Sequence, residues 1–439
     1  MEREIMKDLV EWRERKDRKP LILLGARQVG KTYILKEFGR RYYEHTAYIN
    51  CDDNEWVRNL FVPDYDMKRI LLAISSITGV SIQPEKTLII LDEIQELKRG
   101  LNALKYFCER APEYHVAVAG SLLGITLHQG ESYPVGKVNT LKIHPMTYEE
   151  FLWAKEKHQM CELLKDRNWA VMASTKSMFV QSLREYYFTG GMPEAVSKFL
   201  DTNDAVLVRE VQKEILLAYD KDISKHAPAN EAVRINQVWK SIPAQLAKEN
   251  RKFIYGAVRK GARAKDFEIA IQWLLDAGLV YKVENVSKPA MPLGCYAEYS
   301  SFKLYMLDSG LLGAMNDMPP SLMLMPNNMV ESKGSFTENY VCSQLHSCGN
   351  LSVFYYSKDN STQEVDFVIQ RDVEIAAIEV KAEENLQSKS LKAFHAENPG
   401  IRCVRTSMAD YRKEEWMENV PLYAIKSYVC ELGKELLHR

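Results

Sequence analysis

The residues with the clearest chemical purpose are eight near the amino end of the sequence, Gly25-Ala26-Arg27-Gln28-Val29-Gly30-Lys31-Thr32. Their spacing, G-x-x-x-x-G-K-[ST], is typical of a phosphate-binding loop (P-loop), because glycines let the backbone approach phosphate oxygens without a Cβ clash. Successive N–H groups and a helix N-terminus would face the anion, and Lys31 would add a positive charge at the β- and γ-phosphates. The Thr32 hydroxyl would ligate Mg²⁺, so the motif predicts a site for ATP and Mg²⁺.

Polar residues after two later apolar runs are expected to complete this site. Asp92 and Glu93 follow Thr87 to Leu91, and we expect Asp92 to hold the Mg²⁺ hydration shell and Glu93 to orient and polarise the attacking water. A strand end that merely faces solvent is the alternative for such a pair. Ser121, after Gly120, is expected to reach the γ-phosphate or the water as a sensor, and a plain helix N-cap is the alternative.

A second set of chemical residues lies towards the carboxyl end. Glu338 is expected on the first turn of a helix, Asp366 on a strand, and Glu379 and Lys381 on the next strand, where alternate residues share a face. Glu338, Asp366 and Glu379 would hold Mg²⁺, and Lys381 would stabilise the charge of a phosphodiester under attack. The alternatives are a solvated strand edge, since E-x-K is a common tripeptide, and a nuclease-like fold that binds without cutting.

The elements that must position the first site alternate between strands and helices. Apolar runs predict strands at 21–24, 47–50, 87–93, 116–119 and 138–143, and helical patterns fill 33–38, 53–60 and 67–77. Strands that alternate with helices imply a parallel sheet covered on both faces. The fold class is therefore predicted as α/β, with a P-loop NTPase parallel sheet.

The sequence pattern of residues 149–439 predicts three further parts, each of α or α/β type. The predicted division is a P-loop ATPase core at 1–148, a helical lid at 149–227, a winged-helix-like module at 228–300 and a nuclease-like α/β domain at 301–439. Within the lid, Gly190-Gly191-Met192-Pro193 is interpreted as a structural turn rather than a hinge. In the winged-helix-like module, a basic cluster could contact DNA, although nearby carboxylates favour packing or oligomerisation; its residues are Arg259, Lys260, Arg263 and Lys265.

Composition limits the remaining classes. The 439 residues carry a formal net charge of −1, so no overall basic field draws the chain to nucleic acid or to a membrane. The eight cysteines are scattered without zinc spacing and are interpreted as thiols in a reducing compartment. The amino end lacks the apolar region of a signal peptide, and no stretch has the ~18 uninterrupted apolar residues of a membrane span. We therefore expect a cytoplasmic protein without a membrane partner.

Several motifs together resemble a family of prokaryotic AAA-type ATPases with a C-terminal domain of unknown function that is similar to restriction endonucleases. They are Gly25 to Thr32, Leu91 to Gln95, Gly120-Ser121, Gly136 to Val138, His144 to Met146 with Glu150-Phe151, and Gly190 to Glu194. The resemblance spans nearly the whole chain and implies ATP hydrolysis and a D-(E/D)-x-K nuclease-like site at Glu338, Asp366, Glu379 and Lys381. Lys137 stands where the family commonly has Arg, which puts an arginine-specific contact there in doubt.

Two functions therefore stay open at this point. In the first, ATP turnover drives or gates a domain that acts on DNA. In the second, the ATPase is a nucleotide-controlled switch or scaffold, and the C-terminal domain binds a partner without cleavage. The resemblance also implies a homo-oligomer, because AAA-type sites often take an arginine from a neighbouring subunit, but it nominates no arginine in this chain.

Overall fold

The computed structural model describes residues 1–52, 55–120, 134–248, 251–324, 333–358, 363–384 and 387–433. Its internal contacts divide the chain into two compact units. Unit 1 comprises residues 1–144 and 276–279, and unit 2 comprises residues 145–275 and 280–439.

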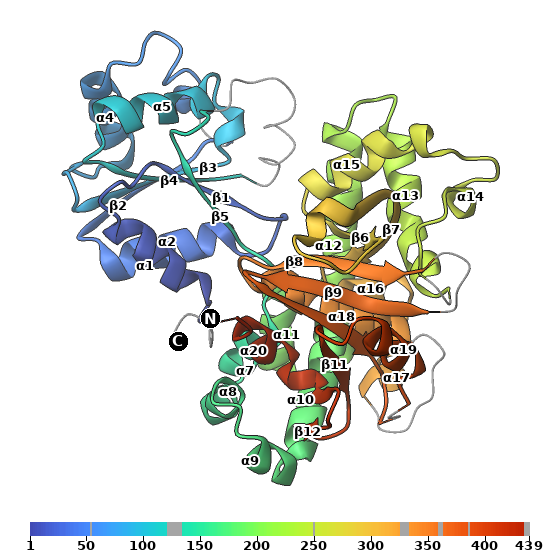
Figure 1. Ribbon diagram of the computed structural model, residues 1–439. Helices are drawn as coiled ribbons and strands as arrows, with labels where there is room; N and C mark the ends of the chain where they lie inside the picture. The colour runs from blue at the N-terminus through green and yellow to red at the C-terminus, as the bar shows by residue number, and fades with distance from the viewer. Residues whose placement is uncertain are drawn as a thin grey trace. The chain divides into compact units, whose positions relative to one another are not determined.

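Unit 1 is built on a five-stranded sheet in the order β2-β3-β4-β1-β5. Every strand pair in this sheet is parallel, which confirms the predicted α/β fold. Helices α1 and α2 lie on one side of the sheet and α4 and α5 on the other (Figure 1). The elements are α1 (Ile5–Glu14), β1 (Leu21–Leu24), α2 (Lys31–Tyr42), β2 (His45–Asn50), α3 (Glu55–Arg58), α4 (Met67–Thr78), β3 (Thr87–Asp92), η1 (Ile94–Glu96), α5 (Gly100–Arg110), β4 (His115–Ala119) and β5 (Asn139–Lys142).

The central strands of unit 1 are buried because their sequences are continuous apolar runs, as expected for a sheet with helices on both faces. All residues of β3 and β4 are buried, including the polar Thr87, Asp92 and His115. Burial of Asp92 at the carboxyl end of β3 places a carboxylate at the edge of the sheet where the P-loop also lies, since β1 ends at Leu24. The sheet thus brings the two halves of the predicted site together.

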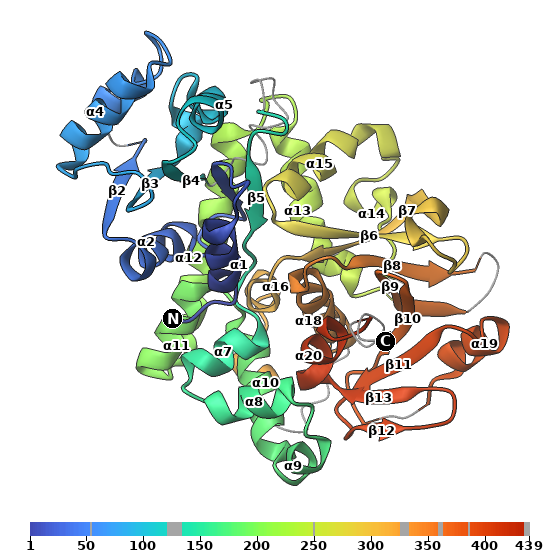
Figure 2. The ribbon, with the colours of Figure 1, turned by 60° about the vertical axis from the view of Figure 1, so that its left-hand side comes forward.

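Unit 2 opens with a run of helices, whose colour runs from teal-green at α7 to yellow at α15 in Figure 2. The run occupies the region predicted as a helical lid and continues into the predicted winged-helix-like module. These helices are α7 (Tyr148–Ala154), α8 (His158–Lys165), α9 (Trp169–Ser174), α10 (Lys176–Thr189), α11 (Pro193–Thr202), α12 (Ala205–His226), α13 (Ala232–Leu246), α14 (Tyr255–Val258), η2 (Ala264–Asp266) and α15 (Glu268–Asp276), the last of which ends in unit 1.

The turn between α10 and α11 is anchored on both sides. Gly190 has φ +73°, and the Gly191 N–H donates to Asp308 Oδ2 at 2.6 Å. The Gly191 carbonyl accepts from the Met146 N–H, also at 2.6 Å. Burial raises the pKa of Asp308 to about 6, and backbone N–H groups, that of Gly191 first, act against this shift. These contacts favour the interpretation of the Gly-Gly turn as structural.

The rest of unit 2 is built on an eight-stranded mixed sheet in the order β12-β13-β11-β10-β9-β8-β6-β7. Helix α18 packs against β7 and β10, and α19 packs against β9 and β10. The elements are β6 (Val280–Val286), η3 (Leu293–Tyr296), β7 (Ala297–Met306), α16 (Ser309–Met315), α17 (Pro320–Leu324), α18 (Lys333–Ser347), β8 (Ser352–Ser357), β9 (Glu364–Arg371), β10 (Glu374–Val380), α19 (Lys389–Glu397), β11 (Arg402–Ser407), β12 (Arg412–Lys413), β13 (Glu418–Pro421), η4 (Leu422–Ala424) and α20 (Ile425–Cys430).

The antiparallel hairpin of β6 and β7 follows the helices α13 to α15, in the chain order of a winged helix. However, β6 also pairs in parallel with β8, so the hairpin extends the C-terminal sheet. The boundary predicted between residues 300 and 301 falls inside β7. The winged-helix-like module and the four-part division stay predictions.

The expectation that all cysteines are thiols is wrong for one pair. Cys348 and Cys430 form a disulfide with a Cα–Cα distance of 5.8 Å and a sequence separation of 82. Cys348 follows the end of α18 and Cys430 ends α20, two helices that pack against each other. No spacing rule connects two single cysteines so far apart in sequence, so the packing of α18 on α20 alone reveals the pair.

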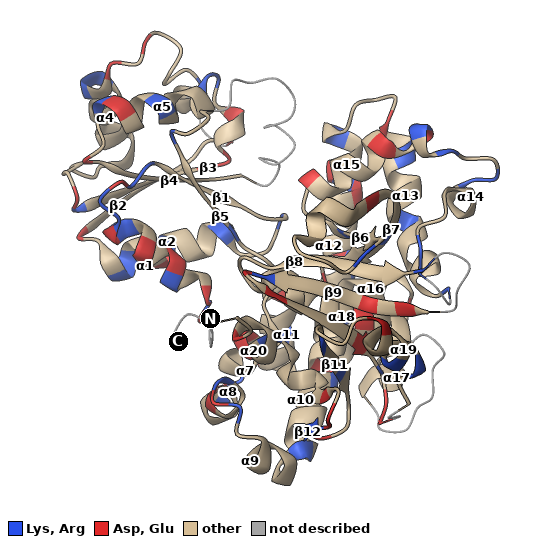
Figure 3. Cartoon of the chain, in the orientation of Figure 1, with Lys and Arg blue, Asp and Glu red and all other residues tan. Residues whose placement is uncertain are grey.

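The surface carries mixed charge. Figure 3 shows Lys and Arg interspersed with Asp and Glu along the helices of both units, in agreement with the formal net charge of −1. Among the described residues, none of the helices is both long enough and apolar enough to cross a membrane.

Candidate nucleotide site and C-terminal carboxylates

The P-loop in unit 1 has the backbone geometry that its glycines predict. A Cβ at Gly25 would lie 2.5 Å from the carbonyl oxygen and 2.8 Å from Cγ2 of Ile143, so the loop passes too close to the end of β5 for a side chain. Gly30 is the N-cap of α2 with φ 94°, a left-handed conformation that glycine adopts without strain. The loop therefore leads directly into the helix N-terminus, where free N–H groups favour an anion.

The Lys31 side chain is folded against this loop. Its Nζ donates to the carbonyl oxygens of Gly25 and Ala26, both at 2.8 Å, and only 7% of the residue is exposed. Burial lowers the pKa of Lys31 to about 8, although the nearby Glu93 and Asp92 act in the opposite direction. The ammonium group is thus held inside the loop, within the electrostatic influence of the two carboxylates at the end of β3.

Thr32 and Asp92, the two residues predicted to ligate Mg²⁺, are in direct contact. The Thr32 hydroxyl donates to Asp92 Oδ2 at 2.6 Å. The hydroxyl of Tyr48, on β2, donates to the same oxygen at 3.2 Å, and the Lys36 ammonium lies 3.5 Å from the centre of the Tyr48 ring. An alcohol and a carboxylate oxygen beside each other at a P-loop form a donor set that suits Mg²⁺.

Glu93, the predicted base, directly follows β3. It adopts a left-handed conformation with φ 53°, and its Oε2 accepts from the Gln95 amide at 2.6 Å. The turn brings a second carboxylate to the carboxyl end of β3, beside the buried Asp92, and Gln95 fixes its orientation. The predicted sensor, Ser121, lies outside the described residues, and Lys137 pairs with Glu109 at 2.9 Å.

Two residues around this site, Arg3 and Tyr48, carried no sequence signal that singled them out, whereas Gln95 lies within the motif Leu91 to Gln95. Arg3 is buried and donates to the carbonyl oxygens of Val29, at 3.0 Å, and His144, at 2.6 Å, so it braces the P-loop. Tyr48 and Gln95 orient the two carboxylates. The β2 position of Tyr48, one strand away from Asp92 in a parallel sheet, is the feature that could have indicated its contact.

The predicted C-terminal residues form two ion-paired groups in unit 2, and Asp366 interacts with both. In the first, Arg251 forms an ion pair with Glu338 Oε1, and the Tyr305 hydroxyl donates to Glu338 Oε2 at 3.2 Å. Burial and then the charge of Asp366 raise the pKa of Glu338, and Arg251 lowers it. The buried Lys303 binds Glu364 Oε1 at 2.5 Å.

The second group consists of Glu379 and Lys381. They pair with each other at 2.8 Å, and Glu379 is almost fully buried while Lys381 is partly exposed. Asp366, on the neighbouring strand, accepts at Oδ2 from the Val380 N–H at 2.8 Å. Within the part of the chain that the structure describes, no group of three or more His, Cys, Asp or Glu residues could hold a metal ion.

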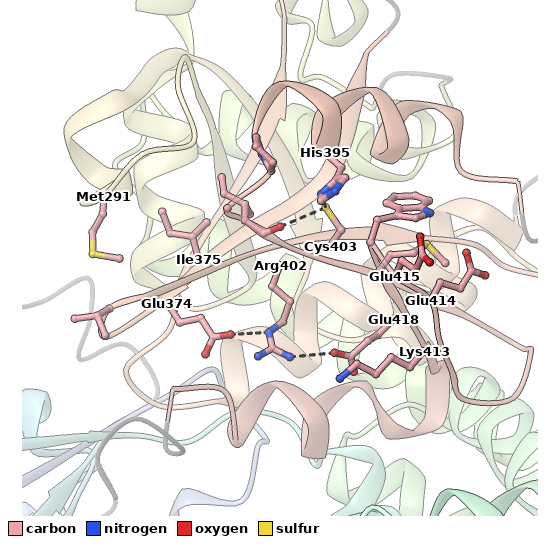
Figure 4. Close-up of a pocket in the computed structure, with 16 residues that line it drawn as sticks. Met291, Glu374, Ile375, His395, Arg402, Cys403, Lys413, Glu414, Glu415 and Glu418 are labelled. Carbon is pink, nitrogen blue, oxygen red and sulfur yellow. Dashed lines mark hydrogen bonds and ion pairs between the residues drawn. The ribbon is translucent and has the colours of Figure 1, made fainter. Parts of the chain in front are cut away.

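A pocket of about 500 Å³ lies elsewhere in the C-terminal sheet (Figure 4). At its floor Arg402 pairs with Glu374 at 2.6 Å and with Glu418 at 3.1 Å. Cys403 Sγ is 3.8 Å from His395 Nδ1, but burial raises the pKa of this cysteine to about 12, so it stays a thiol and is unsuited to nucleophilic attack. Neither group of predicted C-terminal residues lines this pocket.

Three family models match separate parts of the chain. Residues 17–152 match an AAA domain. This match supports an AAA-type, ATP-binding ATPase. Residues 180–322 match a domain of unknown function (DUF8612), and residues 333–425 match another (DUF4143). The predicted nuclease-like character of the C-terminal part is not tested by a match to a domain whose function is unknown.

Individual relatives add little about function. An uncharacterized protein of Methanocaldococcus jannaschii, MJ1637, is 26% identical over 208 residues, which are 44% of this chain and 42% of that protein. The chain thus spans less than half the length of this curated relative. The Walker-type ATPase PABY2304 of Pyrococcus abyssi is 14% identical, with a TM-score of 0.46, over 71% of this chain and 95% of that one. The ORC1 protein of Aeropyrum pernix, solved in complex with DNA, is 14% identical with a TM-score of 0.27, over 73% and 92%.

Proposed function

We propose that the chain hydrolyses ATP with Mg²⁺ and that this reaction takes place at the P-loop of unit 1. The observation that carries the proposal is the 2.6 Å hydrogen bond from Thr32 to Asp92, which joins the phosphate loop to the carboxylate that ends β3. A glycine turn that served structure alone would not need a buried carboxylate against its last residue. The AAA-domain match over residues 17–152 supports the same reaction.

Each side chain has a role in this proposal. The N–H groups of residues 25–32 would bind the phosphates, and Lys31 would exchange its two carbonyl partners for phosphate oxygens. Thr32 and Asp92 would hold Mg²⁺, which supplies charge neutralisation for the transferred phosphoryl group. Glu93, whose orientation is fixed by Gln95, would orient the attacking water and accept its proton.

The binding half of the proposal is tested by Lys31→Ala. This variant is expected to bind ATP about 10- to 100-fold more weakly, because it loses a charge-assisted contact worth about 1.5–3 kcal/mol. Equilibrium binding of a fluorescent ATP analogue with Mg²⁺ measures the change, and Arg40→Ala, an exposed cation further along the same helix, is the control. Equal affinity in Lys31→Ala and the wild type would contradict a nucleotide site at this loop.

The metal half is tested by Tyr48→Phe. When Tyr48 lacks its hydroxyl, the Asp92 carboxylate loses a hydrogen-bond donor that fixes its orientation. Loss of a hydrogen bond to a metal-ligating residue usually changes metal affinity by about 10-fold or more. We expect a rise of about 10-fold in the Mg²⁺ concentration for half-maximal phosphate release, with little change in the rate at saturating Mg²⁺. Tyr33→Phe, an exposed tyrosine on α2, is the control. A lower maximal rate with unchanged Mg²⁺ dependence would show that Tyr48 does not act through Asp92.

For the C-terminal part, we propose the switch or scaffold in preference to the nuclease. The pairing of Glu338 with Arg251 and of Glu379 with Lys381 supports this choice, because metal-dependent cleavage needs carboxylates that are available to the metal. A DNA contact remains a proposal for the exposed basic cluster Arg259, Lys260, Arg263 and Lys265, beside Asp266 and Glu268. A homo-oligomer that shares an arginine between subunits, and a location in the cytoplasm, are proposals as well.

A further inference from the structure

The carboxylates predicted to hold a metal in the C-terminal part lie among positive side chains of the same chain. We propose that Arg251 and Lys303 take the place of a divalent cation beside Glu338, Asp366 and Glu364, so that this cluster does not bind a metal. The inference concerns unit 2 and does not depend on ATP hydrolysis at the P-loop.

Both oxygens of Glu338 and one oxygen of Asp366 already have partners. Arg251 Nη1 pairs with Glu338 Oε1, and the Tyr305 hydroxyl donates to Glu338 Oε2. One oxygen of Asp366 accepts from the Val380 N–H at 2.8 Å. Mg²⁺ demands a near-octahedral oxygen shell, so a metal at Glu338 would first have to displace the guanidinium group.

The charges of the cluster also oppose a metal ion. With all three carboxylates ionised, Glu338, Asp366 and Glu364 face two cations and leave one net negative charge, and this is the most negative state because burial raises the pKa of Glu338. The Lys303 side chain is fully buried and the Glu338 side chain is 3% exposed, so water compensates little of any imbalance. A divalent cation added to this group would leave a net positive charge in a buried place, which is unfavourable without a further partner.

The backbone leaves room for the guanidinium group of Arg251. Gly334 lies in the first turn of α18, and a Cβ there would be 2.8 Å from Arg251 Nη2. Arg251 itself has φ 50°, an uncommon conformation for a residue with a side chain. The left-handed backbone of Arg251 and the missing side chain at Gly334 together allow the guanidinium group to reach the buried Glu338.

The test measures Mn²⁺ binding by electron paramagnetic resonance, without nucleotide and in an Asp92→Asn parent, so that the P-loop site does not contribute. We expect the parent to bind no Mn²⁺ that depends on Glu338 or Asp366. Arg251→Gln is expected to gain about one Mn²⁺ per chain, because it uncovers the carboxylates, and Arg251→Gln with Glu338→Gln is expected to lose it again. Arg259→Gln, an exposed arginine of the same region, is the control and should behave as the parent.

Two results would overturn the inference. The first is Mn²⁺ binding by the parent that disappears in Asp366→Asn, a change at a partly exposed side chain that leaves Arg251 in place. The second is an Arg251→Gln variant with the circular dichroism of the parent and no gained Mn²⁺. Should Arg251→Gln fail to fold, the comparison of the parent with Asp366→Asn still decides.

Discussion

Glu93→Gln is expected to bind ATP as the wild type does and to release phosphate about 100- to 10,000-fold more slowly, the usual contribution of a positioned base. Gln has the size of Glu but cannot accept a proton at neutral pH. Glu93 sits in a left-handed turn directly after β3, with Oε2 held by the Gln95 amide at 2.6 Å. Because the turn and the amide fix the side chain, the substitution should change the chemistry and leave the backbone of the site as it is.

The measurement is steady-state phosphate release at saturating ATP and Mg²⁺, together with equilibrium ATP affinity. A loss in kcat with unchanged affinity assigns Glu93 to the transition state rather than to binding. Glu96→Gln, at the exposed end of the same 3-10 turn, is the matched control and should keep full turnover. Equal phosphate release in Glu93→Gln and the wild type would reject Glu93 as the base.

The sequence predicted unit 1 well because its information is local. An apolar run of four to six residues followed by a glycine loop or a carboxylate pair indicates a buried strand and the polar edge that follows it. The observed strands β1, β3 and β4 lie within one residue of the predicted ranges. What the pattern could not give is the second layer around the site, since Arg3 and Tyr48 reach it only through the packing of α1 and the pairing of β2 with β3.

In unit 2 the decisive contacts join residues far apart in sequence, and the sequence predicted them poorly. The sequence predicted the strand that carries Asp366 and the next strand with Glu379, but not the parallel pairing of β8 with β6, which joins residues 70 positions apart. Glu338 and Asp366 were expected to face a metal together with Glu379. Instead, two cations pair with carboxylates of the C-terminal part. Arg251 lies in the region predicted as a separate winged-helix-like module, and Lys303 lies just after the predicted boundary of that module. Such charge compensation depends on the folded sheet and has no spacing rule.

Gly191→Ala is expected to destabilise unit 2 by about 3 kcal/mol, the upper end of the usual range for overpacking. A Cβ at Gly191 would overlap the carbonyl oxygen of Met146 and lie 2.7 Å from its nitrogen, so it would meet backbone rather than a movable side chain. Neither segment can shift freely. Gly191 exchanges hydrogen bonds with Met146 and Asp308, and the Met146 carbonyl also accepts from the Tyr186 hydroxyl at 2.6 Å.

Native-state hydrogen exchange of α10 and α11 measures this loss as a lower free energy of opening, without the assumption that both units unfold together. Gly256→Ala is the control, because a Cβ there meets no atom within 4 Å and its φ is not positive. That variant should be neutral or more stable by up to about 1 kcal/mol, since alanine favours a helix over glycine. If both variants showed the same small change, the turn after α10 would be free to move. The hinge that the Gly-Gly sequence also permits would then replace the structural turn anchored by Asp308.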